Sequence, residues 1–369
     1  MHTLSEAFVL ATGCGLWRPV HWKWGPAKGL YNIYTFFNVV VMSLLILSEL
    51  IALVLLTENI DDFAEASYVF LASFNGCVKG VTFLWRRKRI DELANVLVEK
   101  EFTPKNMEER RLCSYYDKMS RYVVISYATL VGISSGSTAI WPIFFAQEKY
   151  TLQLKAWYFY DITNDLTYWA TYAHQGLGII IGAAWNTTND VIISGFMMQI
   201  CAQLGLMSHR LQSLPEKSRA AVAQKFSRNE VWLLEKETIK ENVRHHLQII
   251  KFSRDLQTIF APCILVQFCL SIIILCITIY ELTVKSENSA PVSFMLIFLT
   301  SMFVELFLYC WFGNEVTMKS MEFSKIVCNS DWTLLHTDTL KSLLIMMVRT
   351  TSPILVTCGA FITLSLNAS

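Results

Sequence analysis

The sequence has few charged residues and almost no excess of either sign. Charged side chains make up 17% of its 369 residues, and the formal net charge is +1. No basic surface for binding phosphates is therefore expected, which argues against nucleic acid as a partner. Hydrophobic residues instead reach 53%, and the mean hydropathy is +0.39. This composition is typical of a polytopic membrane protein, so the lipid bilayer is the expected environment.

The motifs of common enzymes and metal sites are also missing. The sequence contains no phosphate-binding glycine loop, no HExxH and no CxxC. The histidines are dispersed except for His245 and His246, which a helix would point about 100° apart rather than toward one metal ion. The cysteines lie mostly in apolar runs or in segments expected inside the cell, where disulfides rarely form. We therefore expect no enzyme activity, no metal and no cofactor.

The N-terminus lacks the pattern of a cleavable signal peptide. Met1–Trp24 shows no basic region followed by an apolar core and a small-residue cleavage site. The first apolar span is therefore expected to direct membrane insertion.

Six apolar runs are long enough to cross a bilayer, which takes about 20 residues in a helix. They cover 34–56, 65–85, 122–143, 168–200, 259–281 and 291–313. The fourth is too long for one crossing, and no proline interrupts the sequence from Tyr168 to Arg210. Its helix is therefore expected to project past the bilayer. The expected fold class is an all-α, polytopic membrane helical bundle.

A seventh apolar run, near the C-terminus, is interrupted. Arg349 and Pro353 divide it, and the part from Ile354 to Leu366 is shorter than a bilayer crossing requires. We expect six complete spans and a truncated seventh. The expected division of the chain is a transmembrane bundle with its intracellular loops, 1–313, followed by a C-terminal part, 314–369.

Lysine and arginine are distributed unevenly between the two sides of these spans. If the N-terminus is inside, the inner segments hold 27 of these residues and the outer loops hold three, Lys149, Lys155 and Lys285. Inner loops of membrane proteins carry such an excess. The N-terminus is therefore predicted to be cytosolic. This orientation argues against a G-protein-coupled receptor, in which a chain without a signal peptide normally starts outside.

A long inner segment has the pattern of an amphipathic helix. Between Val231 and Pro262, apolar residues recur at helical spacing, with charged residues on the remaining faces. The apolar positions are Ile239, Val243, Leu247 and Ile250. We expect a cytosolic helix that runs into the fifth span and packs on other helices of the same kind.

Pairs of glycines four residues apart mark three of the spans. The pairs are Gly76 and Gly80, Gly132 and Gly136, and Gly178 and Gly182. Small residues let helix backbones approach closely. Two interpretations remain open, which are ordinary packing of the bundle and space left for a ligand between spans.

Two opposite charges lie inside predicted spans. At ~1.5 Å per residue, Lys79 and Glu305 lie roughly 9 and 12 Å from the inner ends of the second and sixth spans. Charged residues within a membrane tend to pair and often mark function. The hypothesis is an intramembrane ion pair between them, and the alternative is that Lys79 extends its amino group to the inner interface. Glu49 lies in the outer half of the first span and is not expected to join them.

Aromatic side chains with a few hydroxyls and amides gather in the outer halves of spans two, three, four and six. This mixture is typical of a pocket for a small apolar molecule, although aromatic residues near an interface also anchor helices. The candidate ligand-binding residues are Tyr68, Phe70, Phe74, Ser134, Ser137, Thr138, Trp141, Tyr172, His174, Gln175, Phe294, Phe298 and Met302.

An ordered series of short segments resembles the insect odorant receptor family. The segments are LKAWYFYD (Leu154–Asp161), YWATYAHQ (Tyr168–Gln175), DVIISGFMMQICAQLGLMSHRL (Asp190–Leu211), YCWFGNEV (Tyr309–Val316), CNSDW (Cys328–Trp332) and LLIMMVRTTSPILVTCGAFITLSL (Leu343–Leu366). The resemblance covers nearly the whole chain. It depends on the order and spacing of the segments, together with the predicted topology.

The resemblance implies a tuning subunit of a ligand-gated, non-selective cation channel in the plasma membrane of olfactory sensory neurons. Such a subunit forms a hetero-tetramer with an obligate odorant co-receptor and binds a small volatile organic ligand among the outer halves of spans two, three, four and six. The resemblance also implies a cytosolic anchor helix at Leu340–Thr351. The stretch GAFITLSL, 359–366, would begin the pore-lining helix, which is expected to be truncated.

Three alternatives stay open. A gustatory receptor belongs to the same superfamily, and its distinguishing signature would lie in the last helix. A G-protein-coupled receptor would require the opposite orientation. A membrane transporter should show two related halves with broken helices at matched positions, and the sequence shows no such repeat.

Overall fold

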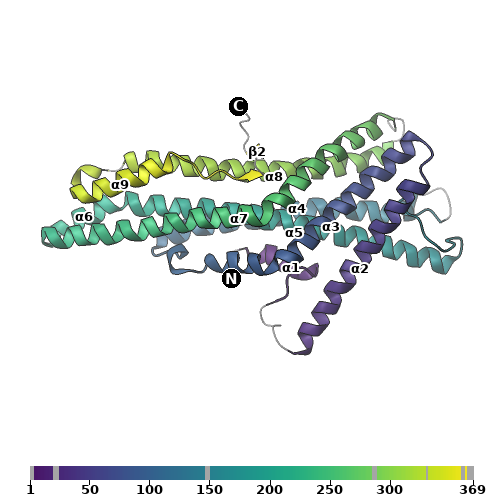
Figure 1. Cartoon of the computed structure of the whole chain (residues 1–369), viewed down its shortest axis with the longest axis horizontal. Coiled ribbons are helices and arrows are strands. Elements are labelled where there is room, and N and C mark those ends of the chain that lie inside the picture. Colours follow the sequence, from purple (N-terminus) through teal and green to yellow (C-terminus); the bar gives the residue numbers. More distant parts are fainter. Residues whose placement is uncertain are drawn as a thin grey trace.

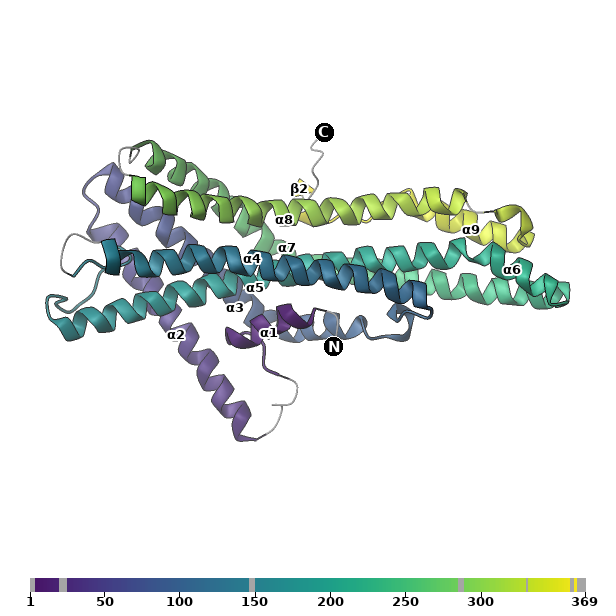
Figure 2. The same ribbon diagram turned by 180° about the vertical axis from the view of Figure 1, so that it is seen from behind.

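Long helices make up almost all of the described structure (Figures 1 and 2). The computed structural model describes residues 4–19, 25–145, 150–284, 289–329, 331–358 and 362–363. The α-helices are α1 Ser5–Gly13, α2 Pro26–Leu55, α3 Ile60–Val96, α4 Met107–Phe145, α5 Asp165–Gln212, α6 Leu214–Ala223, α7 Arg228–Val284, α8 Ser289–Cys328 and α9 Thr337–Thr350. Two 3₁₀ turns, Lys100–Phe102 and Trp332–Leu334, and two short strands, β1 Thr357–Cys358 and β2 Ile362–Thr363, complete the described elements.

The six predicted spans lie in α2, α3, α4, α5, α7 and α8, which confirms the all-α membrane bundle. Within the described ranges, five of these helices, all except α3, are long and apolar enough to cross a membrane. Helix α3 is long enough but carries acidic residues in its first turn and Lys79 in its middle. The expected division at residue 313 lies inside α8, which continues to Cys328 without a break.

Helix α5 is the central axis of the bundle. Its 48 residues extend about 72 Å at ~1.5 Å per residue, more than twice the hydrocarbon thickness, as expected from its sequence. It packs against α1, α2, α3, α4, α7 and α8. In the most apolar 18-residue stretch of this helix, 94% of the residues are buried. The side chains of this stretch therefore contact the other helices rather than lipid.

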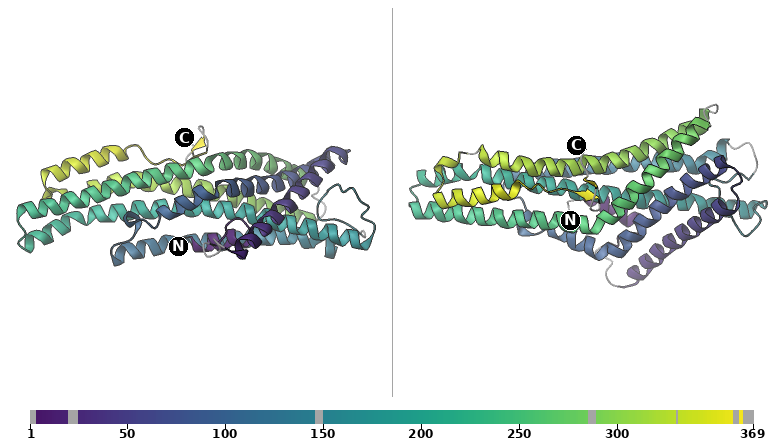
Figure 3. Two further views of the ribbon diagram at one scale, coloured as in Figure 1. Left: turned by 60° about the horizontal axis from the view of Figure 1, so that its bottom comes forward. Right: turned by 45° about the horizontal axis from the view of Figure 1, so that its top comes forward.

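Helix α7 contains both the predicted amphipathic segment and the fifth span. It runs through Pro262 and packs against α9 (Figures 1 and 3). Ile239 is buried, but Leu247 is 58% exposed, so its predicted place on the covered face is wrong. The covered face instead includes His245, whose Nε2 lies 3.0 Å from the Gln203 Oε1 of α5. Hydropathy alone misses a face that is held by polar contacts between helices.

A buried arginine joins α5 to α4 and to the preceding turn. Arg210 donates hydrogen bonds to both carboxylate oxygens of Glu109, at 3.2 and 2.9 Å. It also donates to the backbone oxygens of Glu101 (3.1 Å) and Thr103 (2.9 Å). Since the guanidinium has several partners in a fixed geometry, this part of the bundle is held by directional contacts as well as apolar packing.

The structure distinguishes the glycine pair of α3 from the glycine pair of α4. A Cβ at Gly76 would lie 2.9 Å from the backbone oxygen of Gly182, and a Cβ at Gly80 would overlap a buried tryptophan of α5. These positions hold α3 and α5 in close contact. For Gly132 and Gly136 of α4, no described atom lies within 4 Å of an added Cβ. Close packing thus explains the pair in α3, whereas the pair in α4 faces open space.

The C-terminal part contains the expected helix at the anchor segment, but the expected start of a pore-lining helix is not observed in its described residues. Helix α9 occupies most of the predicted anchor segment, and Ile354 N–H beyond it donates to Ser320 Oγ of α8 at 3.0 Å. Strand β1 then packs on α7 and pairs antiparallel with β2, Thr357 opposite Thr363 (Figure 3). The expected start of a pore-lining helix is wrong at Ile362–Thr363, where β-branched residues favour extended backbone. The other positions of GAFITLSL lie outside the described residues.

Candidate functional site

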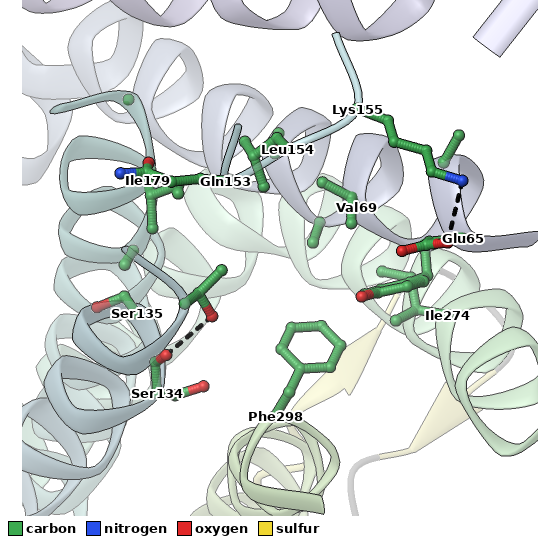
Figure 4. A pocket seen from close by; sticks show the side chains of 18 of the residues that line it. Glu65, Val69, Ser134, Ser135, Gln153, Leu154, Lys155, Ile179, Ile274 and Phe298 are labelled. Carbon is green, nitrogen blue, oxygen red and sulfur yellow. Dashed lines mark hydrogen bonds and ion pairs between the residues drawn. The ribbon is translucent and has the colours of Figure 1, made fainter. Parts of the chain in front are cut away.

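A cavity of about 960 Å³ lies among the transmembrane helices, within the roughly 300–1,000 Å³ typical of small-molecule sites (Figure 4). Helices α3, α4, α5 and α8 provide most of its walls, and α2 and α7 add a few residues. The segment 150–156, which follows α4, lies along it. In Figure 4, Phe298 and Ser134 lie on opposite sides of the open space.

The structure brings to this cavity five of the eleven predicted ligand-binding residues whose side chains are described. The lining includes Tyr68, Ser134, Thr138, Phe298 and Met302, as well as Glu305 from the hypothetical ion pair. It does not include Phe70, Phe74, Ser137, Tyr172, His174 or Gln175. The side chains of Trp141 and Phe294 lie outside the described ones.

Two of the residues that do not line the cavity hold its wall and the loop that follows α4 in place. The Gln175 side chain accepts a hydrogen bond from Leu154 N–H and donates one to Leu154 O, both at 3.1 Å. The Tyr172 hydroxyl donates to Ala139 O on α4 at 2.7 Å. These contacts fix the position of a loop residue that itself lines the cavity.

The other predicted residues have local contacts. Phe70 and Phe74 stack on each other, with ring centroids 6.0 Å apart. The His174 ring meets Tyr158 edge-on at 6.4 Å. The Ser137 hydroxyl donates to the backbone oxygen of Ser134 within α4 at 2.7 Å. These residues therefore make contacts outside the cavity lining, and Phe74 is 38% exposed.

An ion-pair cluster fastens the loop that follows α4 to α3 (Figure 4). The Lys155 ammonium lies 2.7 Å from Asp62 and 3.0 Å from Glu65, and its side chain is 45% exposed. Partial burial acts to lower the pKa of Lys155, but the hydrogen bonds to the two carboxylates outweigh it, and the pKa is raised. Trp157 N–H also donates to Ser48 O of α2 at 3.0 Å. The loop is thus tied to two helices beside the cavity.

A buried charge cluster lies at the other end of the cavity. The Lys79 ammonium contacts Asp190 at 2.6 Å and also Glu305, and all three side chains are about 1% exposed. Two hydroxyls add to it, with Tyr127 donating to Asp190 Oδ2 at 3.0 Å and Tyr309 donating to Asp190 Oδ1 at 2.6 Å. The cluster joins α3, α4, α5 and α8. Lys79 therefore pairs within the bundle rather than reaching an interface.

Side-chain amides extend this cluster along the cavity. Asn186 Nδ2 donates to Glu305 Oε2 at 3.3 Å. Asn75 Nδ2 in turn donates to Asn186 Oδ1 at 3.2 Å and to Gln267 Oε1. Asn75, Asn186, Tyr127 and Glu305 all line the cavity. We call these four residues the polar floor.

Sequence reasoning missed several of these groups. Asp190 lies within the apolar run 168–200, where a carboxylate is as costly as the charges of Lys79 and Glu305. The same rule applied to Asp190 would have found the third member of the cluster. Asn186 and the loop segment 150–156 carried no comparable signal, because an uncharged amide or a loop residue is common outside binding sites.

Comparison with known protein families gives one match that covers most of the chain. The family model described as 7tm Odorant receptor matches residues 59–369. Odorant receptor Or1 of Anopheles gambiae is 24% identical over 328 residues, which cover 84% of this chain and 77% of that receptor. Odorant receptor 46a, isoform A, of Drosophila melanogaster is 21% identical and covers 86% of this chain and 80% of its own length. These relatives are receptors, not enzymes.

Solved structures share the fold. The insect olfactory receptor OR5 from Machilis hrabei aligns with a TM-score of 0.81 at 18% identity, covering 98% of this chain and 92% of that chain. The structure of OR5 in complex with eugenol aligns equally well, with a TM-score of 0.81 at 17% identity. The matched family segment, the related receptors and the shared bundle agree, and the chain belongs to the insect odorant receptor family.

Proposed function

We propose that this chain is a tuning subunit that binds a small volatile organic ligand in the cavity and gates a non-selective cation channel. The observation that carries the proposal is the cavity, whose volume suits a small molecule and whose lining combines apolar side chains with hydroxyl, amide and charged groups. Such a lining holds a ligand mainly by burial of its apolar surface, while the polar groups select its orientation. The OR5 structure with eugenol supports the same type of ligand.

The proposed partner is the odorant co-receptor, in a hetero-tetramer in the plasma membrane of olfactory sensory neurons. Exposed apolar side chains on α9 support an assembly at that end of the bundle, since Leu344, Ile345 and Val348 are each more than half exposed. The N-terminus is proposed to lie in the cytosol, as the distribution of lysine and arginine indicates.

Whole-cell recording tests this function directly. In cells that express the chain with the co-receptor, we expect volatile ligands to evoke a cation current that persists when G-protein signalling is blocked. The current should require both subunits. A response abolished by the block would instead support a G-protein-coupled mechanism.

A matched pair of substitutions on α4 should separate the cavity from the lipid-facing surface. Ser134 lines the cavity, whereas its neighbour Ile133 is 56% exposed. We expect Ser134→Phe to raise the half-maximal ligand concentration at least about tenfold, or ~1.4 kcal/mol, because the ring occupies ligand space. Ile133→Phe should change it less than about twofold. Equal effects of the two changes, at equal surface abundance, would place the ligand elsewhere.

The proposed orientation has its own test. An epitope tag at the N-terminus is expected to bind antibody only after the cells are permeabilised, because the inner loops carry the basic residues. A tag inserted in the loop after Tyr150 should bind antibody on intact cells. The reverse pattern would contradict the proposed topology.

A further inference from the structure

We propose that the polar floor recognises the amino group of a small apolar amine, with Glu305 as its anchor. This inference depends on the proposed function, since it names the chemical class of the ligand for the same cavity. Selection by the size and hydrophobicity of the ligand alone would admit a hydrocarbon, an ester or an amine of equal volume. The inference adds that the ligand carries an amino group.

The first step is the charge balance of the buried cluster. Among the described residues, its ion pairs join one ammonium, Lys79, to two carboxylates, Asp190 and Glu305. All three side chains are almost fully buried, where an uncompensated charge is costly. One negative charge is therefore in excess, and a proton or a bound cation must balance it.

The second step is the position of the excess charge. Asp190 receives hydrogen bonds from Lys79 and from two tyrosine hydroxyls, at 2.6, 2.6 and 3.0 Å. Glu305 receives one from Lys79 and a long one from Asn186, at 3.3 Å. Glu305 also lines the cavity, whereas Asp190 does not. The less satisfied carboxylate is thus the one that borders the cavity.

The third step is the direction of the hydrogen bonds around Glu305. Asn75 uses both hydrogens of its amide nitrogen, on Gln267 and on Asn186. Tyr127 gives its hydroxyl hydrogen to the buried cluster. The floor therefore presents an acceptor in Glu305 Oε2, which suits a ligand that donates. A ligand ammonium donates and also supplies the missing positive charge, whereas a hydroxyl only donates.

The remainder of the cavity is compatible with a cationic head and an apolar body. At its other end, the Lys155 ammonium pairs with the carboxylates of Asp62 and Glu65. Apolar wall residues face the space between the two ends, and they include Val69, Ile179, Ile274, Phe298 and Met302.

The test compares isosteric ligands on the intact receptor complex. Binding of benzylamine, 2-phenylethylamine and hexylamine to the purified complex with the co-receptor is measured by titration calorimetry. Each is compared with the hydrocarbon and the alcohol in which methyl or hydroxyl replaces the amino group. We expect at least one amine to bind ten times or more tightly than both of its isosteres. If no amine exceeds its isosteres, the inference is wrong.

A pair of carboxylate variants locates the anchor. Glu305→Gln keeps the shape of the side chain and leaves Lys79 balanced by Asp190, so this variant is expected to fold. The affinity of the preferred amine should fall tenfold or more, while that of its hydrocarbon isostere changes less than twofold. Glu49→Gln is the matched control, because Glu49 is buried in α2 but does not line the cavity. Unchanged amine affinity in Glu305→Gln would refute the anchor.

These measurements separate the inference from the proposed function. Amine binding with the expected preference but without ligand-evoked current would refute the channel proposal and leave the ligand class standing. Current evoked equally well by amines and hydrocarbons would support the channel and refute the amine preference. The comparison of isosteres on the wild-type complex is decisive even if a variant fails to fold.

Discussion

Replacing Lys79 with methionine is expected to remove most of the receptor from the cell surface. The change leaves Asp190 and Glu305 buried beside each other without the ammonium that now contacts both. Removing one partner from a buried ion pair costs roughly 3–5 kcal/mol. A typical protein has only about 5–15 kcal/mol of stability in total. The variant should therefore be largely retained inside the cell.

Surface biotinylation and thermal unfolding of the purified protein measure this effect. Neutralising the whole cluster with Lys79→Met, Asp190→Asn and Glu305→Gln should restore much of the surface abundance, because no charge then remains buried without a partner. Lys155→Met is the control, since that lysine makes its ion pairs in a partly exposed position, where such pairs contribute about 0–1 kcal/mol. Normal abundance of the single Lys79→Met variant would show that the cluster does not stabilise the bundle.

The buried cluster also changes the result expected when Lys79 and Glu305 are exchanged for each other. In a simple ion pair of these two residues, the exchange would restore the contact. Exchanging the two residues keeps one ammonium and two carboxylates, because Asp190 is unchanged. We expect the double exchange to recover only part of the loss, since Asp190 would then have to pair across a different helix interface. Because Asp190 also belongs to the cluster, the triple variant in which all three charges are neutralised is more informative than the double exchange.

Adding a single methyl group at Gly80 is expected to destabilise the bundle strongly. A Cβ there would overlap the ring of Trp185 on α5. That ring is fully buried, and its Nε1 donates to Cys14 O at 2.9 Å, so it cannot shift without losing a hydrogen bond. Overpacking of this kind costs about 1–3 kcal/mol or more. Gly80→Ala should therefore lower the thermal unfolding midpoint and the surface abundance.

Gly136→Ala is the matched control, because it makes the same chemical change in the same sequence motif. No described atom lies within 4 Å of an added Cβ at Gly136. Alanine has a higher helix propensity than glycine, by about 1 kcal/mol in an exposed helix. This variant should therefore be neutral or slightly more stable. Opposite signs at Gly80 and Gly136 are the expected result, and equal destabilisation would contradict the assigned packing.

The long helices and their continuity were predictable from local sequence. Span lengths follow from runs of apolar residues, and the absence of proline between Tyr168 and Arg210 predicted one uninterrupted helix, which α5 confirms. The helical spacing in α7 predicted an amphipathic segment, although it placed Leu247 on the wrong face. These features depend on neighbours within a turn or two, so a single sequence contains most of the information.

The lining of the cavity was predictable only in part. The four helices that provide most of the cavity wall were among the predicted spans, but rotation of each helix about its axis decides which side chains enter the cavity. A turn of about 100° per residue separates Ser134, which lines it, from Ile133, which is exposed. Leu154, one of the loop residues that complete the lining, is positioned by Gln175 through contacts that no local pattern shows.

The sequence by itself determined the membrane bundle, the family and the presence of costly charges inside the spans, because hydropathy and charge are properties of each residue. Only the tertiary structure decided that Lys79, Asp190 and Glu305 meet, and that Glu305 is the member that lines the cavity. It also decided that Gly80 is packed against Trp185 whereas Gly136 is not. The physical reason is that these contacts join residues as many as 226 positions apart, and their geometry depends on the rotation and crossing of whole helices.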